Sequence, residues 1–308
     1  MNVVALAGGT GAAKFLRGLV TIMPAKDVTV IGNTGDDFEV WGLSVSPDLD
    51  TVMYTLAGLV DETKGWGVRD DTFHCRESMA TLGGGTFLSI GDKDLAVHLR
   101  RTGELRGGAP LSRVTSGLCS ALGVTSRILP MTDDRVRTRV RTPEGWLAFQ
   151  EFFVRERCHP EVLEVAFDGA DRATPAPSVL EAIHGADAIV IGPSNPVSSV
   201  GPILAVPGVR AALIETRARV VAVSPIVGAS PVSGPAGNMM RARGLEVSAL
   251  GVSKAYDGLL DALVVDRQDS ALADPLRAVG VRMVATDAFM SDRESERALA
   301  RVALEAIA

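Results

Sequence analysis

The sequence predicts an α/β fold: a Rossmann-like, doubly wound and mainly parallel sheet that carries a small inserted α+β subdomain. Short apolar strands alternate with helical patterns at both ends of the 308-residue chain, which is typical of a doubly wound sheet. Several of these strands end in glycine-rich or Ser-Asn-Pro turns. Within about residues 125–175 the pattern changes to alternation around Pro143-Glu144-Gly145, which predicts a β-hairpin. We therefore expect one domain, residues 1–308, with an inserted subdomain at about 125–175.

The first predicted unit is a strand, a glycine turn and a helix. Residues 2–7 form a short apolar strand, and apolar residues at helical spacing predict a helix over residues 12–22. The turn between them consists of Gly8, Gly9, Thr10 and Gly11. Free backbone N–H groups at the start of such a helix, together with the helix dipole, attract anions. This turn therefore predicts a nucleotide or phosphate site.

The turn matches the common nucleotide motifs only in part. Gly9 and Gly11 have the spacing of the dinucleotide-binding fingerprint, but Lys14 stands where the third glycine belongs. A P-loop is excluded because Ala13 precedes the lysine and Phe15 follows it. Lys14 is either a phosphate contact or a solvated lysine on the first turn of the helix.

An acidic stretch, residues 31–51, follows the second predicted strand, residues 27–32. Its acidic residues are Asp36, Asp37, Glu39, Asp48 and Asp50. Open α/β sheets bind ligands outside the carboxyl ends of their strands, where the first of these aspartates would lie. Mg²⁺ prefers one or two carboxylates together with phosphate oxygens of a ligand. The alternatives are a solvated acidic loop and, for one aspartate of the second cluster, the capping of the helix that begins near residue 51.

A second turn of phosphate-binding type follows the predicted buried strand at residues 188–191. The polar and small residues in the turn and at the start of the next helix are Ser194, Asn195, Ser198, Ser199 and Gly201. Hydroxyl, amide and free N–H groups at the end of a strand suit a phosphate or a ribose. Ordinary turn chemistry would by itself account for the Ser-Asn-Pro run. Two such turns on one sheet favour a nucleotide site.

The segments between these motifs are expected to surround the site. Residues 61–79 are polar and rich in turns, which predicts a loop or lid whose Trp66 could stack on a flat ligand. A helix then follows Gly91, and its basic residues, which we place on an exposed face, are His98, Arg100 and Arg101. We also expect the arginines of the inserted hairpin to lie on the surface.

Composition excludes several classes of protein. A formal net charge of −6 argues against nonspecific nucleic-acid binding, which needs a basic surface. The three cysteines, Cys75, Cys119 and Cys158, lie far apart, which favours neither a disulfide framework nor a zinc site and suits a reduced, cytoplasmic setting. No apolar run reaches the roughly 18 residues that a membrane span needs. We therefore expect neither a nucleic-acid partner nor a membrane partner.

Motifs along nearly the whole chain resemble those of the CofD family. In chain order they are GGTG, NTGDD, SPDLDT, GDKD, LPMTDD, GPSNPVSSVGPIL and SPIVGASPVSGPAG. Members of this family are 2-phospho-L-lactate transferases of coenzyme F420 biosynthesis. The resemblance implies a Rossmann-like core with an inserted small subdomain, usually in a homodimer.

The resemblance also implies a magnesium-dependent reaction. A phosphoryl-linked three-carbon acid, 2-phospho-L-lactate or phosphoenolpyruvate, would pass from a guanosine diphosphate ester to FO (7,8-didemethyl-8-hydroxy-5-deazariboflavin). The donor would be lactyl-2-diphospho-5′-guanosine or its enolpyruvyl equivalent, and GMP would leave. The sequence does not distinguish the acids. The alternative is a CofD-like regulatory protein that binds a nucleotide sugar without transferase activity.

Site roles follow from the same resemblance. It implies FO contacts at Asp50 and Ser89, a guanosine diphosphate cradle in the GPSNP turn, and a phosphate site at the GGTG turn. We expect Asp37 and Asp50 to be catalytic and to hold Mg²⁺, because phosphoryl transfer depends on positioning and charge neutralisation. Asp36 or Asp48 would stand behind them, and one aspartate would accept the proton of the attacking hydroxyl.

Overall fold

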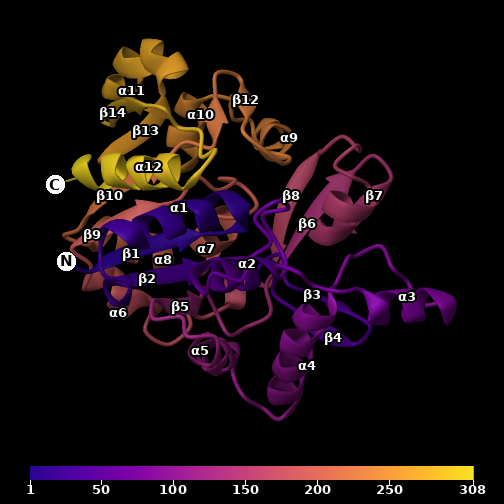
Figure 1. The fold of residues 1–308 in the computed structure, drawn as a ribbon. Helices are drawn as coiled ribbons and strands as arrows, with labels where there is room; N and C mark the ends of the chain where they lie inside the picture. Colours follow the sequence, from indigo (N-terminus) through magenta and orange to yellow (C-terminus); the bar gives the residue numbers. More distant parts are fainter. Residues whose placement is uncertain (308) are drawn as a thin grey trace.

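The centre of the molecule is a seven-stranded sheet in which all neighbouring strands are parallel (Figure 1). The computed structural model describes residues 1–307. Across the sheet the strands are β14 (Arg282–Thr286), β13 (Ala262–Asp266), β10 (Arg219–Val223), β9 (Ala188–Ile191), β1 (Val3–Ala7), β2 (Val28–Gly32) and β5 (Arg127–Pro130). The predicted α/β fold class is confirmed, and the central sheet is parallel throughout.

The strand order reverses at β1. From β1 the chain adds β2 and then β5 on one side, and it later returns to place β9 on the other side. A ligand-binding crevice forms at such a switch point, outside the carboxyl ends of the diverging strands. The glycine turn after β1 and the Ser-Asn-Pro turn after β9 both lead into this crevice.

Two hydrophobic cores, one on each face of the sheet, hold the helices in place. Alternate residues of β1 divide between them, with Val3 in one core and Val4 in the other, because successive side chains of a strand point to opposite faces. The first face is covered by α1 (Gly9–Ile22), α2 (Pro47–Leu56), α5 (Leu111–Ala121) and α12 (Arg293–Glu305). The second is covered by α6 (Val179–His184), α7 (Gly201–Ala205), α8 (Val209–Glu215), α9 (Ala236–Ala242), α10 (Ala249–Ala255) and α11 (Ala273–Ala278).

A separate antiparallel sheet lies between β5 and β9 in the chain. Its strands, in spatial order, are β7 (Gly145–Ala148), β6 (Arg137–Thr142) and β8 (Glu164–Asp168). The hairpin lies where the alternating pattern predicts it. Arg127–Pro130, at the start of the range predicted for the insertion, pairs with β2 and is the edge strand of the central sheet. The division into domains stays a prediction.

The acidic stretch folds into a short hairpin followed by α2. The hairpin strands are β3 (Phe38–Val40) and β4 (Leu43–Val45). Helix α2 begins at Pro47, earlier than the predicted start near residue 51, because proline at the first helical position is compatible with helix geometry. Asp48 and Asp50 therefore lie in the first turn of α2 and not ahead of it.

The predicted lid is partly helical. Helix α3 (His74–Thr81) occupies its end, so that only residues 61–73 form an irregular loop, and α4 (Asp92–Arg106) follows. The remaining short elements are β11 (Ile226–Val227), β12 (Ser230–Pro231), 3₁₀ turns at Ala25–Asp27, Ala170–Arg172 and Arg267–Leu272, and a π turn at Glu151–Arg155. Within residues 1–307, none of the helices has the length and apolar character that crossing a membrane requires.

Helix α1, which starts at the glycine turn, is fixed against α12 by a close backbone approach. A Cβ atom on Gly18 would lie 2.3 Å from the backbone oxygen of Glu296. The side chain of Glu296 is buried and accepts a 2.8 Å hydrogen bond from Nε of Arg17. The position of the glycine turn therefore depends on the packing of these two helices.

Gly18→Ala is expected to lower the free energy of unfolding by about 1–3 kcal/mol, because the new methyl group must displace the α12 backbone. Gly103→Ala is the matched control. This glycine lies in α4 and is exposed, and a Cβ on it would meet no atom of another segment within 4 Å. The control is expected to gain up to ~1 kcal/mol from helix propensity. Urea denaturation measures both. Equal changes in the two variants would contradict the packing argument.

Candidate functional site

The two predicted nucleotide turns lie against each other at the switch point. The Ser194 hydroxyl donates a 2.9 Å hydrogen bond to the backbone oxygen of Gly8 and accepts a 3.3 Å hydrogen bond from its N–H. A Cβ atom on Gly11 would lie 2.5 Å from the backbone oxygen of Pro193, so this glycine is needed for the close approach. The structure thus brings together two turns that are far apart in the sequence, since 186 positions separate Gly8 from Ser194.

The carboxylate of Asp48 closes the start of α1. It accepts 2.8 Å hydrogen bonds from the N–H of Gly9 and from the side-chain amide of Asn33. It makes no cap on its own helix, which begins after Ser46 without a side-chain cap. A Cβ on Gly8 would lie 2.6 Å from this carboxylate. Asp48 therefore caps α1 and not α2. One N–H group of the predicted anion site, that of Gly9, is thus already bound by the protein itself.

The second turn is shaped by the side chain of Asn195. Its oxygen accepts hydrogen bonds from the N–H groups of Val197 (2.9 Å) and Ser198 (3.3 Å), which is an Asx turn. Ser198 and Ser199 are buried, and the Ser198 backbone oxygen accepts a 3.3 Å hydrogen bond from the Asn33 amide. Ordinary turn chemistry thus explains Asn195. The nucleotide contacts assigned to this turn stay a prediction.

Lys14, Thr10 and Gly201 lie on the borders of these turns. Lys14 and Thr10 are half-buried on the first turns of α1, and the structure records no ion pair for Lys14 within residues 1–307. Thr10 lies beneath the predicted lid, because a Cβ on Gly65 would contact its side chain at 3.5 Å. Gly201 begins α7, where a Cβ would lie 2.9 Å from the ring of Phe167 in β8. The crevice is therefore bounded by the lid and by the inserted sheet.

The aspartates of the acidic stretch are not solvated, which excludes the simple acidic-loop alternative. The exposed fractions of Asp36, Asp48 and Asp50 are 5%, 8% and 4%. Ser46 donates a 2.8 Å hydrogen bond to Oδ2 of Asp37. Within the described chain, Oδ1 of Asp36 and Oδ1 of Asp37 are buried without a hydrogen-bond partner. Buried polar atoms normally have partners, so these two oxygens indicate a missing ligand.

Burial also perturbs the titration of these carboxyls. Burial, and then the charge of Asp48, raises the pKa of Asp36 well above its ordinary value. Burial raises the pKa of Asp37 to about 7 and that of Asp48 to about 6. Raised pKa values at neighbouring carboxyls in a cleft are typical of functional sites. The cluster lacks sufficient positive charge, which a bound cation would supply.

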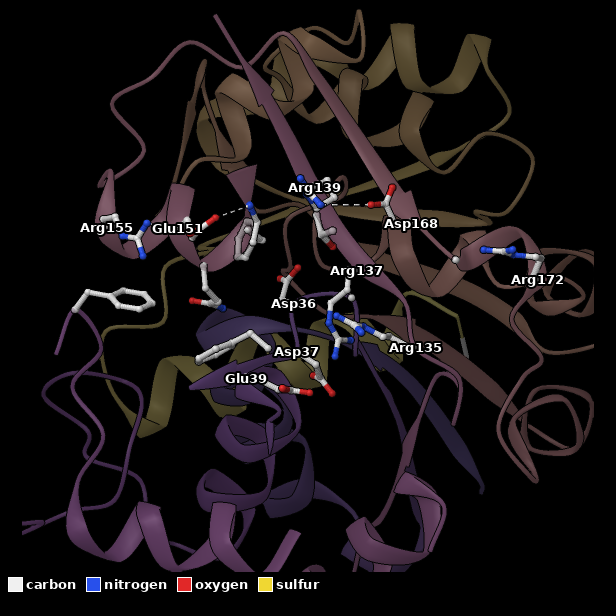
Figure 2. A pocket seen from close by; sticks show the side chains of 18 residues that line it. Asp36, Asp37, Glu39, Arg135, Arg137, Arg139, Glu151, Arg155, Asp168 and Arg172 are labelled. Carbon is white, nitrogen blue, oxygen red and sulfur yellow. Dashed lines mark hydrogen bonds and ion pairs between the residues drawn. The ribbon is translucent and has the colours of Figure 1, made fainter. Parts of the chain in front are cut away.

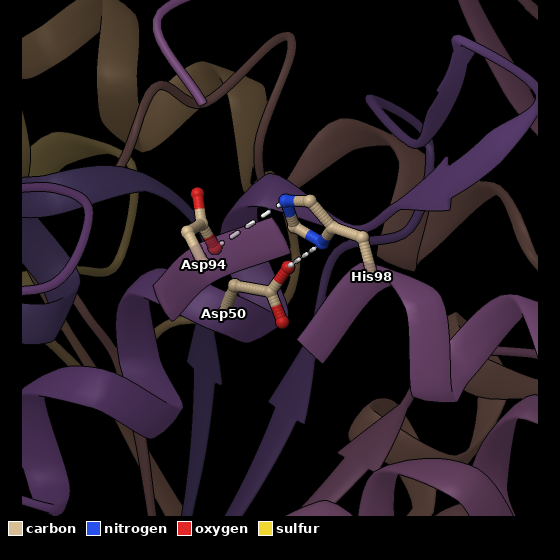
Figure 3. A group of neighbouring side chains, drawn as sticks. All are labelled: Asp50, Asp94 and His98. Carbon is tan, nitrogen blue, oxygen red and sulfur yellow. Dashed lines mark ion pairs between the residues drawn. The ribbon is translucent and has the colours of Figure 1, made fainter. Parts of the chain in front are cut away.

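Asp50 differs from the other aspartates because a buried arginine neutralises it. Arg101 is 1% exposed and binds both oxygens of Asp50, with 3.0 Å between Nη1 and Oδ2. His98 lies between Asp50 (3.7 Å) and Asp94 (3.3 Å), as Figure 3 shows, and Asp94 accepts a 2.7 Å hydrogen bond from the hydroxyl of Tyr54. The expectation of an exposed basic face on α4 is wrong for His98 and Arg101, which are buried, and right for Arg100.

Two groups of side chains have the chemistry of a metal site. Ligand atoms of Asp50, Asp94 and His98 lie within 4.8 Å of one another. However, Arg101 already supplies positive charge there, and a histidine nitrogen is a poor ligand for Mg²⁺. The open oxygens of Asp36 and Asp37 are hard ligands without a cation. The carboxylates around Asp37, with Asp50 close enough for its charge to raise the pKa of Asp37, therefore fit Mg²⁺ better than a set completed by Asp94 and His98.

The GDKD motif is a junction between the lid and α4. Asp71 accepts hydrogen bonds from the N–H groups of Lys93 (2.8 Å) and Asp94 (3.1 Å), while Asp92 accepts them from the first residues of α3. A Cβ on Gly91 would overlap the Asp71 carboxylate. This reciprocal capping orients the face of α4 that holds Asp50. Ser89, just before the motif, is exposed, and the described residues give its side chain no hydrogen bond, so its FO role stays a prediction.

A pocket of about 630 Å³ opens between the acidic stretch and the inserted sheet (Figure 2). Residues 35–39 form one wall, which includes Asp36 and Asp37. The pocket is also lined by five arginines, Arg135, Arg137, Arg139, Arg155 and Arg172. Aromatic rings are supplied by Phe38, Phe87 and Phe149. The expectation of surface arginines is therefore wrong for Arg137 and Arg139 of the hairpin, which line the pocket, and right for Arg141, which is exposed and lies outside it. The alternation in the sequence was the signal that one face of the strand carries them.

Comparison with known proteins decides the family. The family described as "2-phospho-L-lactate transferase CofD" matches residues 3–305. The chain belongs to the CofD family. The phosphoenolpyruvate transferase of Streptomyces griseus is 48% identical over 311 residues, which cover 99% of this chain and 98% of the relative. The 2-phospho-L-lactate transferase of Methanosarcina acetivorans is 44% identical over 297 residues, 96% of each chain.

A solved structure shares the fold of this CofD protein. The protein BH3568 of Bacillus halodurans, a member of the UPF0052 family, superposes with a TM-score of 0.71 over 98% of both chains. Its sequence identity is 20%, so this likeness concerns the fold alone. Family membership confirms the expectation of a CofD-type transferase of coenzyme F420 biosynthesis.

Without a bound cation, the CofD acidic cluster is expected to make the protein less stable as pH rises. Unfolded carboxyls ionise near their ordinary pKa of 3.8, but in the folded protein Asp37 ionises only at about 7 and Asp48 at about 6. Because these folded pKa values are raised, the stability contribution is present at low pH and is lost between about pH 4 and pH 7. Carboxyls with lowered pKa, such as Asp92 and Asp292, change the stability of the protein only at pH values below this window.

The expected loss of unfolding free energy from about pH 5 to about pH 7.5, in EDTA, exceeds ~1 kcal/mol. Urea denaturation at the two pH values measures it. Asp37→Asn is expected to reduce the loss, whereas Glu39→Gln, at a neighbouring exposed residue, is expected to leave it unchanged. An identical pH dependence in the wild-type protein and Asp37→Asn would contradict the role of the buried cluster.

Proposed function

We propose that this protein transfers a phosphoryl-linked three-carbon acid from a guanosine diphosphate ester to the terminal ribityl hydroxyl of FO, with release of GMP. The acid is 2-phospho-L-lactate or phosphoenolpyruvate, in keeping with the names of the two relatives. The observation that supports this best is the position of the buried aspartates. They lie between a crevice of nucleotide-binding type and an arginine-lined pocket, where a phosphoryl group in transfer would need to be held.

The crevice at the switch point is assigned to the guanosine diphosphate part of the donor. The supporting features are the start of α1 and the polar turn after β9, which lie in contact through Ser194 and Gly8. Helix starts and turns with free N–H groups bind phosphate well. Residues assigned to the nucleotide and its phosphates are Gly8, Gly9, Thr10, Gly11, Lys14, Ser194, Asn195, Ser198, Ser199 and Gly201. Asp48 occupies the N–H of Gly9, so the other groups of this set carry the phosphate contacts.

Mg²⁺ is assigned to Asp37 and Asp50, with Asp36 and Asp48 beside them. Asp37 has an open oxygen, and Arg101 holds Asp50 in a fixed orientation while each carboxylate oxygen keeps a second lone pair. When bound, the cation neutralises charge on the phosphate oxygens of the donor. Asp50 and Ser89 are assigned to FO. A homodimer is the expected assembly.

The reaction forms a bond between the FO hydroxyl oxygen and the phosphorus that bears the acid. The bond from that phosphorus to the bridging oxygen of the GMP phosphate breaks, and GMP leaves with the electron pair. The hydroxyl proton passes to one of the aspartates of the cluster, which acts as the general base. The buried walls of the site orient the two substrates and limit water.

The proposed transfer is tested with purified protein, FO, Mg²⁺ and each guanylylated donor. Mass spectrometry is expected to show GMP and FO with the added mass of the acid. If no donor gives both products while a nucleotide sugar binds tightly, the protein is a regulatory binder and the transferase proposal is wrong.

Asp37→Asn is expected to lower kcat at least ~100-fold, because it removes a ligand of the proposed Mg²⁺. Mg²⁺ is also expected to raise the Tm of the wild-type protein and not that of Asp37→Asn, which gives a readout independent of turnover. Glu144→Gln, at an exposed residue of the hairpin turn outside the pocket, serves as the control for turnover. Asp50→Asn is less suitable alone, because it leaves Arg101 buried with one neutral partner. Near-normal turnover in Asp37→Asn would remove this residue from the site.

A further inference from the structure

Two arginines of the pocket have no acidic partner. Three of the five are paired: Arg139 with Asp168 (3.7 Å), Arg155 with Glu151 (2.9 Å) and Arg172 with Asp171 (3.9 Å). For Arg135 and Arg137, the structure records no ion pair among residues 1–307. Figure 2 shows their guanidinium groups close together beside Asp37. Arg137 thus lies half-buried near Asp37 without a direct ion pair, and Arg135 beside it is exposed, so both guanidinium groups are open to an anionic ligand.

Arg137 is held in place and is not a freely moving surface side chain. It begins β6, where its backbone pairs with Asp168 of β8, and it is half-buried. Its Nη1 donates a 2.7 Å hydrogen bond to the backbone oxygen of Val136, which fixes the guanidinium group. Burial lowers the pKa of Arg137; the charge of Asp37 opposes this effect, the charge of Arg135 adds to it, and Glu39 and Asp36 oppose it more weakly. A bound anion would relieve the unfavourable contact between the two cations.

An adjacent hydroxyl strengthens the case for a ligand at this point. Thr138 follows Arg137 in β6, is 2% exposed and lines the pocket. Within the described residues its Oγ1 is buried without a well-aligned hydrogen bond, although it lies close enough to Asp36 to lower the pKa of that carboxyl. The open oxygens of Asp36 and Asp37 belong to the same pocket. The place thus combines two arginines without an ion pair, a buried hydroxyl next to Asp36, and a group of carboxylates that suits a metal ion.

The acids named in the two CofD relatives share a chemical group that fits the arginine pair. 2-Phospho-L-lactate and phosphoenolpyruvate both carry a carboxylate on the carbon that bears the phosphoester oxygen. The planar guanidinium group matches a carboxylate with two parallel hydrogen bonds. With the phosphorus held near Asp37, the carboxylate would be only a few bonds away, and Arg135 and Arg137 stand beside Asp37.

We propose that Arg137, with Arg135 beside it, binds the carboxylate of the three-carbon acid and so selects an acid donor over a neutral ester. This subsite rests on the proposed function. It binds the carboxylate, which the lactyl and enolpyruvyl donors have in common, and does not distinguish the two acids from each other. Arg137 acts on substrate binding and on the orientation of the phosphorus, while Asp37 and Asp50 remain at the reacting atoms.

The test compares two donors in one assay: lactyl-2-diphospho-5′-guanosine, and the guanosine diphosphate ester of ethanol, which lacks the carboxylate. The wild-type protein is expected to prefer the lactyl donor by ~100-fold or more in kcat/KM, since the neutral ester leaves the arginine pair unpaired. Arg137→Met is expected to lose ~30-fold or more on the lactyl donor and little on the ethyl donor, because only the former has the group it binds. On the lactyl donor, the kcat/KM of Arg137→Lys is expected to lie between those of the wild-type protein and Arg137→Met, because lysine keeps the charge but not the two parallel hydrogen bonds.

Arg141→Met is the matched control. Arg141 lies further along the same strand, outside the pocket, and is already paired with Glu164 at 3.0 Å. Its substitution is expected to leave both donors unaffected. Equal losses on both donors in Arg137→Met would mean that the arginine contacts phosphate or merely supports the fold, and unchanged kinetics would mean no contact. Either result overturns the proposal.

Equilibrium binding separates this proposal from the proposed function. Calorimetry with the same two donors and without FO is expected to show the preference of the wild-type protein for the lactyl donor, and its loss in Arg137→Met. Preferential binding without product formation would contradict the transferase and retain the subsite. Product formation with equal affinity and equal kcat/KM for both donors would retain the transferase and contradict the subsite.

Discussion

The structure of the site depends on the carboxylate of Asp48. From the first turn of α2 it binds the N–H of Gly9 at the start of α1 and the amide of Asn33 after β2. Two strand exits are thereby fixed to one helix, and Gly8 must be glycine because the carboxylate fills the space of a side chain. A carboxylate at a helix start is favourable, but its burial there adds negative charge next to Asp36. The geometry of the crevice and the charge of the cluster therefore have one origin.

The remaining charges of the site are balanced unequally. Arg101 neutralises Asp50 inside the protein, and the Asp71–Asp92 junction keeps α4 in the position that this contact requires. Asp36 and Asp37 keep open oxygens, and Arg137 lacks a partner although it lies nearby. Burying unbalanced charge costs free energy, so such an arrangement is stable chiefly when ligands of both signs complete it. A divalent cation and an anionic donor have the charges that are missing.

The inserted sheet gives the open edge of the central sheet a second wall. Strand β6 brings its arginines to the carboxyl end of β2, where an unmodified doubly wound sheet would leave the acidic stretch facing solvent. Phe167 of β8 contacts the position where a Cβ on Gly201 would lie, so the insertion also reaches the second nucleotide turn. One small sheet therefore connects the crevice with the pocket.

The sequence by itself determined the features that depend on local patterns. Apolar strands, glycine turns and the alternation of the hairpin predicted the fold class, the two polar turns and the acidic stretch, because each follows from the conformation of a few successive residues. It did not reveal that Arg101, 51 residues from Asp50, is its buried partner, or that Asp48 binds Gly9 rather than capping α2. An isolated charged residue has the same pattern whether it is solvated or paired. Only the packing of α4, α2 and β6 around the switch point decided which charges are neutralised and which remain open.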